Sequence, residues 1–169
     1  MRNKITLRKL VLLAFFVAIG VVISPILRVH GFAPTQHLVN IVCSVFLGPW
    51  YSLVCALSIG ILRMMFFAIS PLAITGGIFG AFLSGVLYRK FNENILAACA
   101  GEIIGTGIIG SMVSFPVMKF VAGDAKVALF TFTPSFLAAT IIGSIVAFSF
   151  LKILERNKTL GRMKASLDE

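Results

Sequence analysis

The sequence predicts an all-α integral membrane protein, built as a bundle of six transmembrane helices in a single domain that spans residues 1–169. Two observations predict this class. The chain is 59% hydrophobic and has a mean hydropathy of +1.03. Long stretches, such as 29–62 and 64–88, contain no charged residue. A bilayer core of roughly 30 Å needs about 20 apolar residues per helix, so this length allows about six spans and no sizeable soluble domain.

Glycine, proline and polar residues interrupt the apolar sequence and place the helices. The first helix ends before a polar loop that contains Gly31 and Pro34. The second is short and ends at Gly48-Pro49, because proline does not continue a helix comfortably. We expect this short helix to cross with little tilt or to lie partly inside the bundle. The six predicted helices are, in chain order, 7–28, 37–47, 50–67, 71–90, 95–121 and 134–154.

The later helices are bounded in the same way. Ser70-Pro71 opens the fourth helix, and the polar turn 91–94 separates it from the fifth. Gly123-Asp124 closes the fifth helix, and Pro134 opens the sixth. The remaining segment, 155–169, is charged, and we expect it to form a frayed cytoplasmic tail.

The distribution of positive charge predicts the orientation. Six spans place both termini on one side, and the positive-inside bias makes that side cytoplasmic. A net charge of +9 would suggest nucleic acid as the partner of a soluble protein. Here the cations flank apolar spans, so we expect the lipid bilayer and no nucleic acid. The cations on the predicted cytoplasmic side are Arg2, Lys4, Arg8, Lys9, Arg89, Lys90, Lys152, Arg156, Lys158, Arg162 and Lys164.

A polar cluster begins the second predicted helix. Gln36, His37 and Asn40 lie at spacings that place them on neighbouring positions of a helix surface. They supply hydrogen-bond donors and acceptors without a fixed charge, which suits a small polar or aromatic heterocycle. The alternative is ordinary interfacial polarity, with Thr35 as the N-cap residue.

Two charged residues lie deepest within the apolar segments, Arg63 and Glu102. A charge at membrane depth is costly, so it usually faces the bundle interior or a cavity. Arg63 either reaches into an outward-facing cavity with its guanidinium or extends to the interface. Glu102 is either a structural hydrogen-bond partner, a binding residue or a proton-coupling acid. At 1.5 Å per residue we expect the two to lie about 10 Å apart along the membrane normal.

The fifth predicted helix is rich in small residues around Glu102. Gly101, Gly105 and Gly107 allow close approach of another helix, or they make room for a ligand. Thr106 and Ser114 add hydroxyl groups. We therefore predict an outward-facing pocket between 29–36, the third helix and the fifth helix. Its substrate-binding residues are Gln36, His37, Asn40, Arg63, Glu102, Thr106 and Ser114, and the aromatic residues near its mouth are Phe66, Phe67, Phe115, Phe130 and Phe132.

The sequence contains no motif for catalysis, nucleotide binding or metal binding. G-x-x-x-x-G-K-[ST] does not occur, and the G-x-G-x-x-G match at 105–110 (GTGIIG) lies inside a predicted apolar helix and does not follow a strand, as a dinucleotide-binding motif would. H-E-x-x-H and G-x-S-x-G are also absent. The three cysteines form no C-x-x-C pair and no metal-ligand spacing. We therefore expect no enzymatic activity, no catalytic residue, no metal and no cofactor.

The first predicted helix carries Ala14 and Ala18, a small-xxx-small pair that lets another helix come close. Six short spans, this alanine pair and the basic tail resemble the substrate-binding S components of prokaryotic energy-coupling factor (ECF) transporters. Among these S components, the chain resembles the ThiW family in four stretches. These are 36–40 (QHLVN), 47–51 (LGPWY), 62–63 (LR) and 101–110 (GEIIGTGIIG).

This resemblance implies a function and partners. ThiW proteins are assigned to hydroxyethylthiazole, the thiazole precursor of thiamine. An S component captures its vitamin outside the prokaryotic cell membrane and docks on a transmembrane T component driven by two ATPases. Ala14 and Ala18 would then form the docking face; the alternative is packing within the chain's own bundle. One departure from the family pattern is that 70–76 lacks the Pro-Gly expected at the entry to the fourth helix.

Other functions stay open on the sequence alone. An S component for another vitamin or precursor would share these features. A stand-alone transporter could use Glu102 for proton coupling, although the two halves show no internal repeat of the kind common in such carriers. A small membrane enzyme could use His37 as a base.

Overall fold

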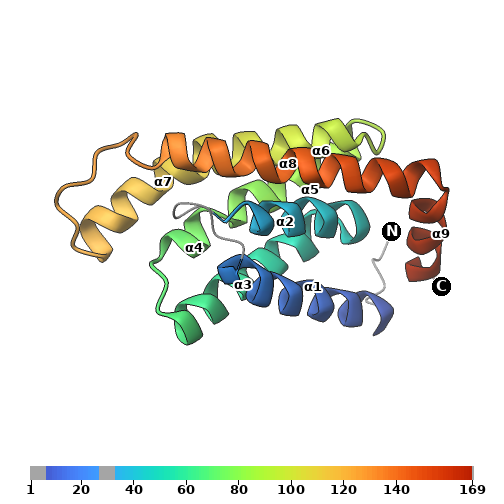
Figure 1. Cartoon of the computed structure of the whole chain (residues 1–169), viewed down its shortest axis with the longest axis horizontal. Coiled ribbons are helices and arrows are strands. Elements are labelled where there is room, and N and C mark those ends of the chain that lie inside the picture. Colours follow the sequence, from blue (N-terminus) through green and yellow to red (C-terminus); the bar gives the residue numbers. More distant parts are fainter. Residues whose placement is uncertain (1–6, 27–32, 169) are drawn as a thin grey trace.

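The computed structural model shows a bundle of helices and describes residues 7–26 and 33–168. Figure 1 shows that most of these helices run along one long axis. Five stretches in the described part are long and apolar enough to cross a membrane, which confirms the prediction of a helical membrane bundle. They are Leu7–Pro25, Pro49–Phe67, Leu72–Lys90, Ile95–Val121 and Thr133–Arg156.

The short second helix, α2 (Pro34–Leu47), lies at the centre of the bundle (Figure 1). It packs against α1 (Leu7–Ile26), α3 (Pro49–Phe67), α5 (Ile78–Lys90) and α8 (Thr133–Arg156). At 1.5 Å per residue its 14 residues extend about 21 Å, which is shorter than the bilayer core. Nearly all of its side chains are buried, so its polar residues face other helices and not lipid.

The start of α2 differs from the prediction. The helix begins at Pro34, three residues earlier than expected, because proline is well suited to a first turn whose N–H has no helical partner. The residue at the N-cap is Ala33, and no side chain caps the helix. The predicted N-cap role of Thr35 is therefore wrong, since Thr35 lies within the first turn. The predicted end of the first helix and the start of the following loop fall outside the described residues.

The predicted fourth helix is divided into α4 (Leu72–Thr75) and α5. The break falls at Gly76 and Gly77, and two side chains of α2 reach the backbone around it. The Nε2 atom of Gln36 donates to the carbonyl oxygen of Ala73 at 3.4 Å, and Asn40 Nδ2 donates to that of Gly77 at 3.2 Å. Irregular backbone is tolerated at membrane depth where protein groups satisfy it, and α2 provides these groups.

The predicted fifth helix is continuous over 95–121 but changes its winding. It consists of α6 (Ile95–Glu102), the π-helix η1 (Ile103–Gly110), α7 (Ser111–Pro116) and the π-helix η2 (Val117–Val121). π-Helical turns are rare and occur frequently at functional sites. Here the first of them directly follows Glu102.

The glycines of this long helix make room for α5. A Cβ atom on Gly101 would lie 2.6 Å from the Cα of Ser84, and one on Gly105 would lie 2.6 Å from the Cα of Gly80. Both neighbours are backbone atoms that cannot move aside as a side chain could. These glycines therefore serve helix packing, which is one of the two functions the sequence suggested for them.

We expect Gly105→Ala to destabilise the protein by about 1–3 kcal/mol, the usual effect of overpacking a tight contact. Thermal unfolding in detergent measures this as a lower Tm. Gly161→Ala is the matched control, because a Cβ atom there meets nothing within 4 Å. An unchanged Tm in Gly105→Ala would contradict the close packing of the two helices.

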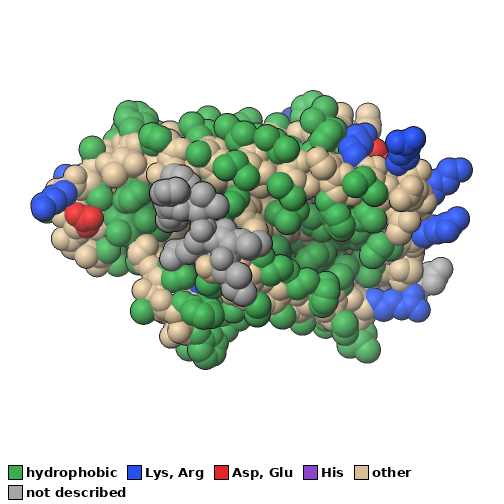
Figure 2. Space-filling model, in the orientation of Figure 1, with side chains coloured by type: hydrophobic (Ala, Val, Ile, Leu, Met, Phe, Trp, Pro, Cys, Tyr) green, Lys and Arg blue, Asp and Glu red, His purple; other side chains and the backbone are tan. Residues whose placement is uncertain are grey.

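The C-terminal segment folds back as a helix, so the predicted frayed tail is wrong. This helix, α9 (Thr159–Asp168), buries Leu160 and lies across the end of the bundle (Figure 1). Arg8 of α1 donates to the carbonyl oxygen of Ser166 at 2.6 Å, and Lys164 pairs with Glu93 of the α5–α6 turn at 2.7 Å. Three distant parts of the sequence thus meet at one end, where Figure 2 shows Lys and Arg side chains gathered.

Candidate functional site

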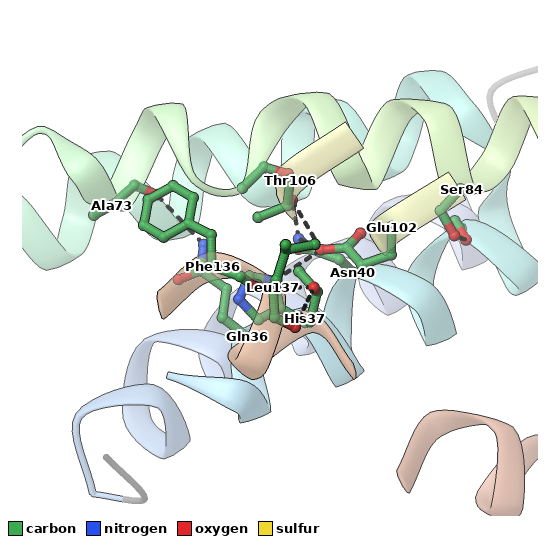
Figure 3. Close-up of polar contacts among 12 residues, drawn as sticks. Gln36, His37, Asn40, Ala73, Ser84, Glu102, Thr106, Phe136 and Leu137 are labelled. Atoms are coloured by element: carbon green, nitrogen blue, oxygen red, sulfur yellow. Dashed lines mark hydrogen bonds and ion pairs between the residues drawn. The ribbon is translucent and has the colours of Figure 1, made fainter. Parts of the chain in front are cut away.

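A buried carboxylate organises the polar interior of the bundle. Glu102 is fully buried, and its Oε1 atom accepts hydrogen bonds from Asn40 Nδ2 at 3.0 Å and from Thr106 Oγ1 at 3.2 Å. His37 Nδ1 lies 2.8 Å from the same oxygen (Figure 3). When Glu102 is ionised its oxygens can only accept hydrogen bonds, and His37 then donates from Nδ1 in this contact. That leaves Nε2 as the ring nitrogen available on the other side of His37.

The local sequence explains why these side chains meet. His37 and Asn40 are three residues apart on α2, and Glu102 and Thr106 are four residues apart at the junction of α6 and η1. Residues at these spacings lie on one face of a helix. The two faces oppose one another because α2 packs directly against α6 and against α5, and α5 in turn packs against η1.

Arg63 is held in a second, adjacent set of contacts. Its guanidinium donates to Oε1 of Gln36, whose Nε2 in turn donates to the backbone of Ala73. Only 2% of Arg63 is exposed, so its side chain does not extend to the membrane interface. The interfacial alternative for Arg63 is therefore wrong. Arg63 and Glu102 contact different partners, and α2 lies between them.

A cavity of about 230 Å³ lies against these two sets of contacts. Its walls come from the first turn of α2, the end of α3, the α4 segment and the start of α8. Polar and aromatic side chains both contribute to the lining. The lining residues are Ala33, Gln36, His37, Arg63, Ile69, Ser70, Leu72, Ala73, Gly76, Phe132, Ser135, Phe136 and Ala139.

The structure brings three of the seven predicted binding residues to this cavity: Gln36, His37 and Arg63. Three others, Asn40, Glu102 and Thr106, are hydrogen-bonded behind His37 and do not line it. The seventh, Ser114, lies elsewhere: it contacts the Thr75 hydroxyl at 2.6 Å and so links α7 to α4. The sequence suggested the fifth helix as one wall of the pocket, but α4 and α8 form that part of the wall.

Two lining residues of α8, Ser135 and Phe136, were not singled out from the sequence. Phe136 lies beside the contact between Gln36 and Ala73 (Figure 3). The available signal was their position just after Pro134, in the first turn of a helix that starts at the same end as α2. Among the predicted aromatic residues Phe132 lines the cavity. The others, Phe66, Phe67, Phe115 and Phe130, do not.

Ala14 and Ala18 lie on the outer face of α1. Both are exposed, whereas Phe16 and Gly20 of the same helix point into the bundle. The alternative that the two alanines pack within the chain's own bundle is therefore wrong. They form a smooth strip that lipid or another protein can contact.

Comparison with known proteins gives the family. No match was found among curated proteins or among solved structures. A protein-family model described as thiamine-precursor transporter protein (ThiW) matches residues 10–157. The matched region contains every helix from α1 to α8 almost entirely, and with them all the residues that line the cavity. The chain therefore belongs to the ThiW family of thiamine-precursor transporter proteins, and is a multi-pass membrane protein with a small-molecule ligand.

Proposed function

We propose that this chain is the substrate-binding S component of an ECF-type importer, and that it captures hydroxyethylthiazole outside the cell. The observation that carries this proposal is the cavity beside Gln36, His37 and Arg63 in a chain of a thiamine-precursor transporter family. Pockets for drug-sized ligands measure about 300–1,000 Å³, so a cavity of about 230 Å³ fits one small heterocycle.

The chemistry of the lining matches this ligand. Hydroxyethylthiazole has a ring nitrogen that accepts a hydrogen bond, a hydroxyl group and a flat apolar face. Arg63 supplies donors for the ring nitrogen, and the hydroxyl can donate to Nε2 of His37. Ser135 can exchange either type of hydrogen bond, and Phe136 can cover the flat face.

The proposed orientation follows from the charges. α2 spans the membrane together with the five long helices, which makes a single domain with six spans and both termini in the cytoplasm. The end that carries α9, the start of α1 and the α5–α6 turn then faces inward. The cavity lies toward the opposite end, by the α3–α4 turn and the start of α8, and so opens to the outside of a prokaryotic cell membrane.

The proposed partners are a transmembrane T component and two ATPases. The sequence has no G-x-x-x-x-G-K-[ST] motif, so uptake driven by ATP would take its ATPases from other chains. Ala14 and Ala18 offer an exposed strip of small residues for that contact.

Calorimetry with the purified chain tests the proposed ligand. We expect wild type to bind hydroxyethylthiazole, and His37→Ala to weaken binding about tenfold or more, because one buried hydrogen bond is worth on the order of 1–3 kcal/mol. Asn40→Ala should weaken it by a similar factor, since Asn40 holds both Glu102 and the backbone of Gly77.

Ser149→Ala is the control, because this serine is exposed and bonds only within its own helix. A folded wild-type protein that binds no hydroxyethylthiazole would overturn the proposed ligand. Wild-type affinity in both His37→Ala and Asn40→Ala would instead remove the assigned cavity.

A further inference from the structure

The described wall of the cavity carries charge of one sign. Arg63 is the charged side chain in it, and it is held there by Gln36, with only 2% of its surface exposed. Arginine stays protonated in proteins, so this positive charge is permanent. No Asp or Glu is among the described residues that line the cavity.

Three acidic residues whose side chains the structure describes lie away from this wall: Glu93, Asp124 and Glu155. Glu93 and Glu155 form ion pairs with lysines at the cation-rich end, and Asp124 is exposed in the loop before α8. Asp168 and Glu169 belong to the C-terminal segment. Glu102 contacts His37, which lines the cavity, but Glu102 itself does not line it.

The carboxylate of Glu102 does not line the cavity. Its Oε1 atom receives hydrogen bonds from Asn40 and Thr106 and lies 2.8 Å from Nδ1 of His37. The imidazole ring therefore stands between the carboxylate and the cavity. A ligand in the cavity meets the guanidinium of Arg63 directly and meets Glu102 only across the histidine.

We propose that this cavity is a charge filter, which accepts a neutral heterocycle and rejects the same heterocycle once its ring nitrogen is alkylated and positively charged. The inference rests on the proposed function, because it concerns the same site. A cation placed against Arg63 is repelled, because two like charges a few ångströms apart and partly buried in a protein are screened much less than charges in water. Selectivity of this kind comes from a repulsive contact with the wrong ligand.

This filter separates a precursor from the finished vitamin. In free hydroxyethylthiazole the ring nitrogen is unalkylated, and the molecule is neutral. In thiamine the same nitrogen carries the pyrimidine arm, and the thiazolium ring is a permanent cation. Arg63 can thus distinguish the two by the charge of the ring alone.

The test compares hydroxyethylthiazole with its N-methylthiazolium derivative, which differs by one methyl group and one positive charge. We expect the cation to bind wild type about 100-fold more weakly, the effect of two like charges about 6 Å apart at an effective dielectric constant of about 20. The neutral thiophene analogue, which lacks the ring nitrogen, measures separately the effect of losing that hydrogen-bond acceptor.

Two substitutions identify Arg63 as the source. In Arg63→Lys the charge remains, and we expect the cation to stay disfavoured relative to the thiophene analogue. In Arg63→Gln the charge is removed, and the difference between the cation and the thiophene analogue should shrink at least tenfold. The ratio of affinities is the readout, so a general loss of affinity in a variant does not imitate the result.

Three results would contradict the proposed filter or the role of Arg63 in it. Binding of the cation within about threefold of the neutral thiazole in wild type overturns the filter and leaves the proposed function standing. The same ratio in Arg63→Gln and Arg63→Lys likewise removes the assignment to Arg63. Binding of neither thiazole overturns the proposed function and, with it, this inference.

Discussion

Replacing Glu102 with alanine is expected to lower the stability of the bundle strongly and to reduce ligand affinity more than 100-fold. The change leaves the donors of His37, Asn40 and Thr106 without their common acceptor in a fully buried place. Each buried donor that is left without an acceptor lowers the free energy of unfolding by on the order of 1–3 kcal/mol. Their sum is a large part of the stability of about 5–15 kcal/mol that proteins usually have.

Glu102→Gln should be tolerated better than Glu102→Ala. The amide keeps the shape of the side chain, and its oxygen can still accept one or two of the three hydrogen bonds. Its NH₂ group cannot accept, so a partial loss of affinity and of Tm remains. Thermal unfolding in detergent and calorimetry with hydroxyethylthiazole measure the two effects. Glu155→Ala is the control, because Glu155 makes an exposed ion pair with Lys152, and such pairs are worth little.

The same pair of variants separates the proposed function from a stand-alone, proton-coupled transporter. A proton-coupling Glu102 must exchange a proton, and glutamine cannot do so. In that case uptake would be lost as completely in Glu102→Gln as in Glu102→Ala, while folding and binding stayed intact in the glutamine variant. We expect graded losses instead, because three side chains, His37, Asn40 and Thr106, share the Oε1 atom of Glu102.

The sequence predicts the helices well because membrane insertion imposes simple rules. Charge-free stretches and their Gly and Pro boundaries are enough to place α3, α8 and the start of α1 within a few residues. The division between α4 and α5 was not predicted, because it depends on a different helix. Gln36 and Asn40 of α2 donate hydrogen bonds to the backbone carbonyl oxygens of Ala73 and Gly77 around the break. The fold of α9 was also missed, since charge alone suggested a frayed tail, while Leu160 and contacts to distant segments hold it.

The site was predicted in part, for a physical reason. A polar or charged residue in an apolar helix is conspicuous, and this singled out Gln36, His37 and Arg63. Two polar residues share one cavity only when they lie at a similar depth along their helices as well as on facing helix surfaces. Ser114 lies 12 residues after Glu102, about 18 Å along a helix, and so reaches Thr75 instead. The position of Ser135 just after Pro134 marks the start of a helix, but it does not reveal that this helix packs against α2, about a hundred residues earlier in the sequence.

Uptake should be abolished by Ala14→Trp or Ala18→Trp, while ligand binding to the isolated chain stays unchanged. Both alanines are exposed on α1, one helical turn apart, and neither lines the cavity. Lipid tails are as apolar as a helix surface, so close packing must stabilise a contact between two membrane proteins. An indole ring on this strip prevents that approach, but it leaves α2 and the cavity untouched.

Two measurements on the same variants test this docking face. Calorimetry with hydroxyethylthiazole gives the affinity of the purified variant, and uptake of the thiazole is followed in whole cells that carry the T component and the ATPases. Ala100→Trp is the matched control, because Ala100 is also an exposed alanine but lies on α6, on the opposite side of the bundle from α1 (Figure 1). Normal uptake in both Trp variants would remove the docking role from α1. If α1 is the docking face, a Trp residue on α6 should not affect uptake. Equal loss of uptake in Ala100→Trp would therefore show that any bulky residue on the surface disturbs transport, and would contradict a docking role specific to Ala14 and Ala18.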